Sequence, residues 1–118
     1  MDEAELGAAA FEDLVREAFE SIPSALHELM ENVEVVVEDE PPHGEPLLGF
    51  YQGVPLTARG AFYAAALPDK ITIFRGPIER AYGADHTQLR AQVRRTVLHE
   101  VAHHFGISDE RLVEIDRY

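Results

Sequence analysis

DHTQLRAQVRRTVLHEVAHHFGISD, residues 85–109, is the stretch of sequence that decides the fold. Its apolar residues recur at helical spacing, which predicts one helix of about 20 residues, roughly 30 Å long, beginning at His86. Asp85 is placed to cap the first turn of this helix, and Gly106 suits the left-handed residue that ends it. Most of the last third of the chain, from His86 to Gly106, is therefore predicted to be one long helix.

This helix carries the sequence HEVAH, residues 99–103, which is an HExxH motif. His99 and His103 lie one turn apart on one helix face, so both imidazoles can bind the same zinc ion. Glu100 lies beside them and can act as the general base toward a water activated by the metal. The motif therefore predicts a hydrolytic zinc site.

The opposite helix face is predicted to be buried, because it carries Leu98, Val101 and Phe105. A helix packed on that face presents the two ligand histidines to a cleft. His104 lies about 100° round the helix from His103, so it cannot share the ligand face. We expect His104 either to bind a substrate carbonyl or to pack in the interior.

A catalytic zinc takes three protein ligands, so a further residue must complete the site. The chain has no cysteine, and carboxylates follow the motif at Asp109, Glu114 and Asp116. Asp109 is favoured, because Gly106 can break the helix three residues after His103 and turn the chain back toward the metal. The resulting spacing is HExxHxxGxxD. Glu114 is the second choice, in case the turn is wider.

The rest of the sequence predicts a single α+β domain over residues 1–118. Helical spacing of apolar residues alternates with short runs rich in β-branched residues. The expected elements are two N-terminal helices (11–22 and from Pro23), a small sheet of about three strands (33–38, 47–52 and 71–74, the last closed by Gly76-Pro77), the long HExxH helix, and a short C-terminal helix capped by Ser108. Residues 53–69 give no clear pattern.

Charge and composition exclude several classes of partner. The formal net charge is −12, and residues 1–45 alone hold 14 acidic residues and one basic residue. Such a chain repels phosphate backbones, so we expect no nucleic-acid partner. The acidic half is interpreted as solvated helix faces, the alternative being attraction of metal ions or basic peptides.

The N-terminus lacks the pattern of a signal peptide and no segment is apolar enough for a membrane span, so a cytoplasmic protein is expected.

Three blocks of the sequence resemble the minimal zincin-like metallopeptidases of bacteria. They are LLGFYQGVPLT (47–57), LPDKITIFRGP (67–77) and RRTVLHEVAHHFGISDERL (94–112), and the resemblance covers most of residues 33–112. It implies a compact zincin core with the HExxHxxGxxD site. Carried over residue by residue, the motif implies His99, His103 and Asp109 as zinc ligands and Glu100 as the base.

Larger relatives, the metzincins, share the glycine spacing but use a third histidine and a methionine turn beneath the metal. Here the only methionines are Met1 and Met30, so no methionine turn can form. Zincins also need a donor for the tetrahedral oxyanion. The sequence leaves four candidates for it: Tyr51, Tyr82, His104 and Tyr118.

The function expected from these residues is zinc-dependent hydrolysis of peptide bonds in a peptide or protein, with Glu100 as general base. In zincins the peptide commonly lies along an edge strand, and residues 71–74 are the candidate strand. A chain this short predicts a shallow groove and weak activity. The first alternative is a zincin-like metal-binding module with little or no catalysis, acting in binding or regulation. The second is a metal-free acidic interaction protein in which the motif is accidental.

Overall fold

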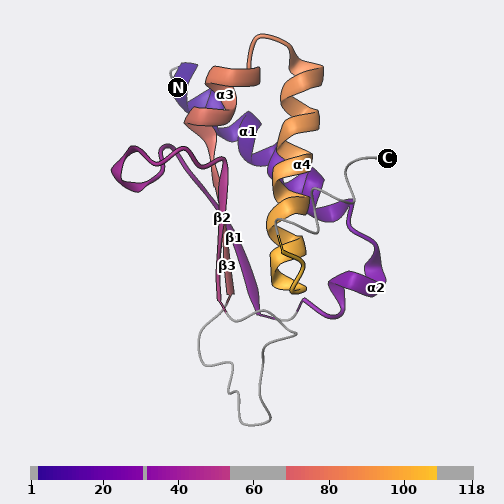
Figure 1. Cartoon of the computed structure of the whole chain (residues 1–118). Helices are drawn as coiled ribbons and strands as arrows, with labels where there is room; N and C mark the ends of the chain where they lie inside the picture. Colours follow the sequence, from indigo (N-terminus) through magenta and orange to yellow (C-terminus); the bar gives the residue numbers. More distant parts are fainter. Residues whose placement is uncertain (1–2, 31, 54–68, 109–118) are drawn as a thin grey trace.

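The structure is a computed structural model that describes residues 3–30, 32–53 and 69–108. Within these residues it has the predicted α+β architecture, with a three-stranded sheet and a long helix that carries the HExxH motif (Figure 1). The elements in chain order are α1 (Glu3–Glu20), α2 (Ser24–His27), β1 (Val33–Glu38), the 3-10 turn η1 (Pro42–Gly44), β2 (Gly49–Gln52), β3 (Asp69–Phe74), α3 (Arg75–Tyr82) and α4 (His86–His104).

The sheet has the strand order β1-β3-β2. β3 pairs with β1 in parallel, with Val35 opposite Ile71, and with β2 in antiparallel, with Tyr51 also opposite Ile71. The prediction that residues 71–74 form an edge strand is therefore wrong. The order of strands along the chain does not determine their order in space, and β3, buried along most of its length, is the central strand. Among the described residues, β2 is the edge strand that lies against α4.

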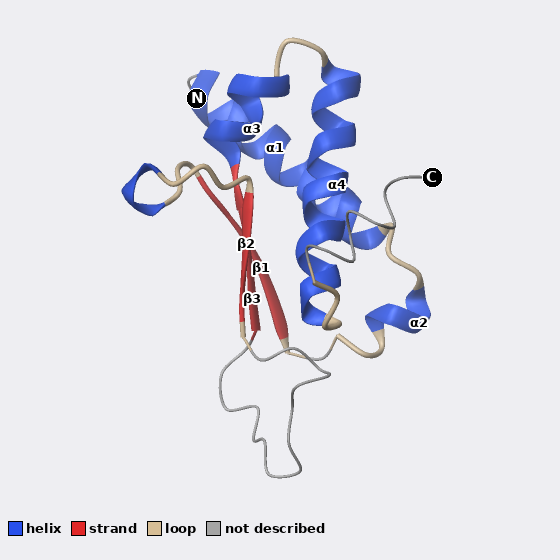
Figure 2. Ribbon diagram, viewed as in Figure 1, coloured by secondary structure: helices blue, strands red, loops and turns tan. Residues whose placement is uncertain are grey.

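The helices α1, α2 and α4 lie on one side of the sheet (Figure 2). α4 packs against β2 and β3, while α1 and α3 pack against α4. The main buried cluster joins side chains of α1, the central strand and α4; it includes Phe11, Val15 and Ala18 of α1, Ile22 just after it, Ile71 and Ile73 of β3, and Val93, Val97 and Val101 of α4. α4 is thus held from several sides at once. None of the described helices is both long and apolar enough to span a bilayer.

The sequence did not predict α3. The sequence predicts the end of a strand at Gly76-Pro77, whereas Pro77 lies in the first turn of α3. Proline is tolerated there, because the N–H groups of a first turn have no partner within the helix. The first strand was predicted correctly at residues 33–38, and the other two differ from the prediction by two residues at their starts. The predicted short C-terminal helix lies outside the described residues.

Candidate metal centre

Both ends of α4 form as the sequence predicts. The Asp85 side chain accepts hydrogen bonds from the backbone N–H groups of Thr87 and Gln88, at 2.9 and 3.3 Å. At the other end Gly106 has a φ of 82°, and the Ile107 N–H donates to the carbonyl of Ala102 at 2.9 Å. This is the Schellman arrangement, which ends the helix directly after the motif.

The buried face of α4 differs from the predicted one. Val101 is buried as expected, but Leu98 is 38% exposed. The observed face also contains three polar residues spaced four apart, namely Thr96, Glu100 and His104, all less than 7% exposed. The prediction followed hydrophobic residues alone and could not identify a buried polar column. This column, Thr96-Glu100-His104, faces the sheet.

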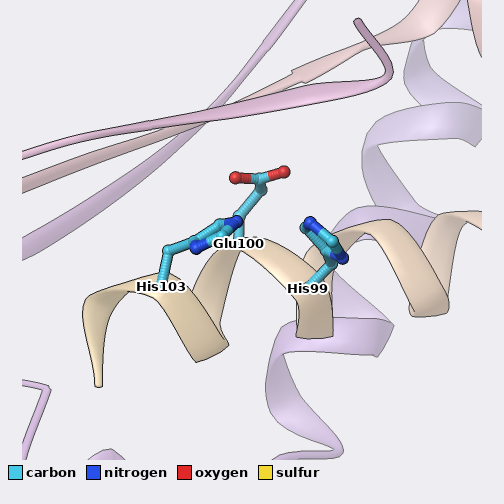
Figure 3. Close-up of side chains that lie close together, drawn as sticks. All are labelled: His99, Glu100 and His103. Carbon is cyan, nitrogen blue, oxygen red and sulfur yellow. The ribbon is translucent and has the colours of Figure 1, made fainter. Parts of the chain in front are cut away.

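The side chains of the two histidines and the glutamate of the motif lie close together. One ligand atom each from His99, Glu100 and His103 lies within 4.8 Å of the others. The two imidazole centroids are 4.8 Å apart, and the rings meet edge to face. The three side chains project from one side of the helix, and the Glu100 carboxylate points toward the strands (Figure 3). Both histidines are half-buried, whereas Glu100 is 6% exposed.

The donor set fits a zinc ion. Neutral imidazoles bind zinc at about 2.0–2.1 Å, and two of them at the i and i+4 positions of a helix can meet at one ion. The predicted third ligand, Asp109, and its alternative, Glu114, both lie outside the described residues. The described part of the chain ends at Ser108, two residues past the left-handed Gly106 that follows α4.

Glu100 lies against β2 at Gly49. A Cβ atom on Gly49 would lie 2.9 Å from Cγ2 of Thr96 and 3.1 Å from Cγ and Oε2 of Glu100. The missing side chain therefore lets β2 approach α4 directly over the motif. This close approach holds the Glu100 side chain between the helix and the edge strand.

We expect Gly49→Ala to lower the free energy of unfolding by about 1–3 kcal/mol, because the added methyl group overpacks a contact with the stiff, β-branched Thr96. Urea denaturation measures the change. Gly7→Ala is the matched control: it lies in α1, and its Cβ would meet only the flexible end of Arg75, so it is expected to be neutral or stabilising. Equal stability of the two variants would contradict the close approach at Gly49.

A buried hydrogen-bond network lies beside the motif. The Tyr51 hydroxyl donates to Oδ2 of Asp69 at 2.6 Å, and Nδ1 of His104 lies 2.8 Å from the same oxygen. His104 is 0% exposed and Asp69 is 2% exposed. His104 therefore packs in the interior rather than facing a cleft. It contacts Asp69 of β3 and Tyr51 of β2, and so links α4 to both strands. Among the described residues, its Nε2 has no hydrogen-bond partner.

The network bears on the candidate oxyanion donors. The Tyr51 hydroxyl already donates a hydrogen bond to Asp69, and His104 is fully buried. Tyr82 ends α3, before the start of α4, and is separated from the motif by most of the length of that helix. Tyr118 lies outside the described residues. Among the described candidates, Tyr51 and His104 are therefore engaged in the buried network, and Tyr82 lies away from the motif.

Asp69→Ala is expected to destabilise the protein, because it leaves the buried Nδ1–H of His104 without its acceptor. Such a loss costs about 1–3 kcal/mol and should lower Tm by about 5–10 °C. The control is Asp13→Ala, which removes an exposed ion pair with Arg16 and should change Tm by no more than a few degrees. A Tm for Asp69→Ala equal to that of the control would rule out this role for Asp69. Differential scanning calorimetry gives both values.

The sequence did not reveal that Asp69 forms a buried hydrogen-bond network beside the motif. The residue was visible as a carboxylate directly before a β-branched strand, inside one of the blocks that resemble the zincin-like family. Its partner His104 was visible as the second of two adjacent histidines. Only the three-dimensional pairing, across 35 residues of sequence, shows that the two belong together.

Known proteins resemble this chain both in sequence and in fold. The sequence profile of the zincin-like metallopeptidase family matches residues 30–118. A solved structure of a conserved hypothetical protein from Thermo thermophilus is similar, with 28% identity and a TM-score of 0.59, over 84% of this chain and 94% of that chain. No functionally curated protein matches significantly. Since the profile covers most of the chain and its HExxH residues converge on α4, the chain belongs to the zincin-like metallopeptidase family.

Proposed function

We propose that the protein is a zinc-dependent peptidase that hydrolyses peptide bonds. His99 and His103 bind the metal, Asp109 completes the ligand set, and Glu100 is the general base. The observation that carries this proposal is the convergence of two imidazoles and one carboxylate within 4.8 Å on one side of α4. Membership of the zincin-like family supports it.

Each side chain has a separate task in this proposal. A zinc ion held by His99 and His103 would supply Lewis acidity to the attacking water and to the scissile carbonyl. Glu100 accepts the proton that the attacking water loses and later delivers a proton to the leaving amine. Its burial against β2 restricts the positions of its carboxylate, which favours a fixed geometry for proton transfer.

The substrate strand in this proposal is β2 rather than β3. One side of β2 pairs with β3, and no other described strand pairs with it. An extended peptide can add to such an edge through backbone hydrogen bonds. Gly49 brings β2 into contact with Glu100, so a peptide on this edge would pass close to the proposed base.

The alternative is a metal-binding module with little or no turnover. A metal used only for structure needs no base beside it, so the placement of Glu100 favours the peptidase. The deciding experiment is incubation of the zinc-loaded protein with a random peptide library, followed by mass spectrometry. Cleavage that a chelator abolishes and zinc restores is the expected result. Zinc binding without any cleavage would favour the alternative.

A further inference from the structure

Two successive contacts hold the edge strand β2 on α4. Gly49 and Tyr51 occupy alternate positions of β2, so both face the same side of the sheet. Gly49 lies against Glu100. The Tyr51 hydroxyl lies 3.5 Å from Nδ1 of His104, one helical turn further along α4. Two residues of a strand span about 6.6 Å and four residues of a helix span about 6 Å, so the contacts are similarly spaced on both elements. Together they set the register of β2 on α4.

Asp69 joins this arrangement to the central strand. It is the first residue of β3 and is 2% exposed. Its Oδ2 accepts a hydrogen bond from the Tyr51 hydroxyl at 2.6 Å and lies 2.8 Å from Nδ1 of His104. Gly53, which directly follows β2, lies against the same carboxyl group, since a Cβ atom there would be 2.5 Å from Cγ and Oδ1 of Asp69. One buried carboxylate therefore contacts both the edge strand and α4.

The hydrogen bonding of His104 is confined to one side of its ring. Nδ1 lies beside Asp69, whereas Nε2 has no partner among the residues that the structure describes. The ring is 0% exposed, so it pays a desolvation cost that an apolar residue of similar size would avoid. Each hydrogen bond, however, requires a defined distance and angle. What this network gains over apolar packing is therefore a defined position of β2 relative to α4.

We propose that Tyr51, Asp69 and His104 are positioning residues of the peptidase, which hold the substrate strand β2 in a fixed register over the metal ligands and the base on α4. The inference rests on the proposed function, because it takes β2 as the strand on which a peptide lies. It goes beyond that function by giving the buried network a part in the reaction. None of the three residues needs to touch the substrate or the metal.

Loss of the network should affect the alignment of a peptide but not the metal. His99, Glu100 and His103 all belong to α4, so a shift of β2 leaves the spacing of the two ligands unchanged. A peptide should still pair with β2, but its scissile carbonyl would be displaced from the metal. A displacement of about 1 Å can cost about 100-fold in rate. We therefore expect a lower kcat, with KM and the zinc affinity unchanged.

Two replacements of His104 test this expectation. His104→Leu removes the donor to Asp69, whereas His104→Asn keeps an N–H donor near the position of Nδ1. Neither variant retains Nε2. With the zinc-loaded full chain and the best library peptide, kcat is expected to fall by up to about 100-fold in His104→Leu while KM stays unchanged. His104→Asn is expected to recover at least about tenfold of that loss, the worth of one hydrogen bond to a charged group.

Ile78→Val is the control for a loss of stability alone. Ile78 is a fully buried residue of α3 that takes no part in the network, so this variant should lower Tm by several degrees and leave kcat unchanged. An equal loss of kcat in this control, or equal losses in His104→Asn and His104→Leu, would overturn the inference. A higher KM with an unchanged kcat, or loss of zinc from His104→Leu, would overturn it as well.

Tyr51→Phe provides a second test if His104→Leu fails to fold, because it removes one hydroxyl group and keeps the ring. The expected result is a fall in kcat of about tenfold with an unchanged KM, since the hydroxyl donates to a carboxylate. A loss of kcat in Tyr51→Phe, with none in a folded His104→Leu, would make Tyr51 an oxyanion donor and overturn the inference.

Amide hydrogen exchange, followed by mass spectrometry, distinguishes the failure of this inference from that of the peptidase, because it needs no substrate. His104→Leu is expected to raise the exchange of residues 49–52, and Ile78→Val is not. Raised exchange, without cleavage of any peptide by the unmodified protein, would keep the attachment of β2 to α4 and overturn the peptidase. Hydrolysis that needs Glu100 but proceeds equally well in both His104 variants would overturn this inference and leave the peptidase intact.

Discussion

Replacing Glu100 with glutamine is expected to lower kcat/KM for peptide hydrolysis by about 10²–10⁴-fold, the contribution typical of a positioned general base. Zinc content and Tm should stay close to those of the unmodified protein. Glutamine has nearly the shape of glutamate, so it fills the space between α4 and Gly49. It cannot accept the proton of the attacking water at neutral pH.

The measurement is hydrolysis of the best library peptide by both zinc-loaded proteins, with zinc content determined on the same samples. Glu20→Gln is the control, because Glu20 is an exposed residue at the end of α1 and its replacement removes the same charge. Equal hydrolysis by Glu100→Gln and the unmodified protein would end the assignment of Glu100 as base. Loss of zinc from Glu100→Gln would instead make Glu100 a ligand, since its carboxylate lies within 4.8 Å of the ligand atoms of both histidines.

Asp109→Ala is expected to weaken zinc binding by about 100-fold or more. Changes to residues that merely support a metal ligand typically cost 10–100-fold in affinity, so the loss of a ligand should cost at least as much. The choice of Asp109 rests on the sequence: Gly106 ends α4 directly after the motif, and Asp109 follows Gly106 by three residues. A competition titration with a fluorescent zinc chelator gives the affinity.

Glu114→Ala is the matched control for Asp109→Ala, and its zinc affinity is expected to be unchanged. Circular dichroism of the apo proteins checks that both variants fold. The reverse pattern, with normal affinity in Asp109→Ala and loss in Glu114→Ala, would assign the third ligand to Glu114. Loss in neither variant would show that the third ligand lies elsewhere.

Local patterns in the sequence predicted α4 and its ends, because their causes are local. The carboxylate of Asp85 caps backbone N–H groups only two or three residues away, and the left-handed conformation of Gly106 ends the helix at that position. The i, i+4 spacing of His99 and His103 likewise places both imidazoles on one face of any helix. The core of the metal centre could therefore be predicted without the fold.

Features that depend on distant parts of the chain could not be predicted in the same way. The central position of β3 depends on its pairing with two strands at once, and residues 71–74 show no sign of this beyond their apolar character. The burial of Glu100 and His104 depends on what β2 and β3 offer opposite them, namely the space at Gly49 and the carboxylate of Asp69. A polar residue on a helix is expected to be exposed, because its burial is costly unless a residue from elsewhere in the fold offers it a partner.

The central claim is that this chain binds one zinc ion through His99 and His103. Elemental analysis of untagged protein, purified without added metal, tests it most directly, with the double variant His99→Ala, His103→Ala prepared in parallel. The account predicts about one zinc ion per chain in the unmodified protein and almost none in the variant. No zinc in the unmodified protein, and none taken up on dialysis against zinc, would contradict it and favour a metal-free interaction protein.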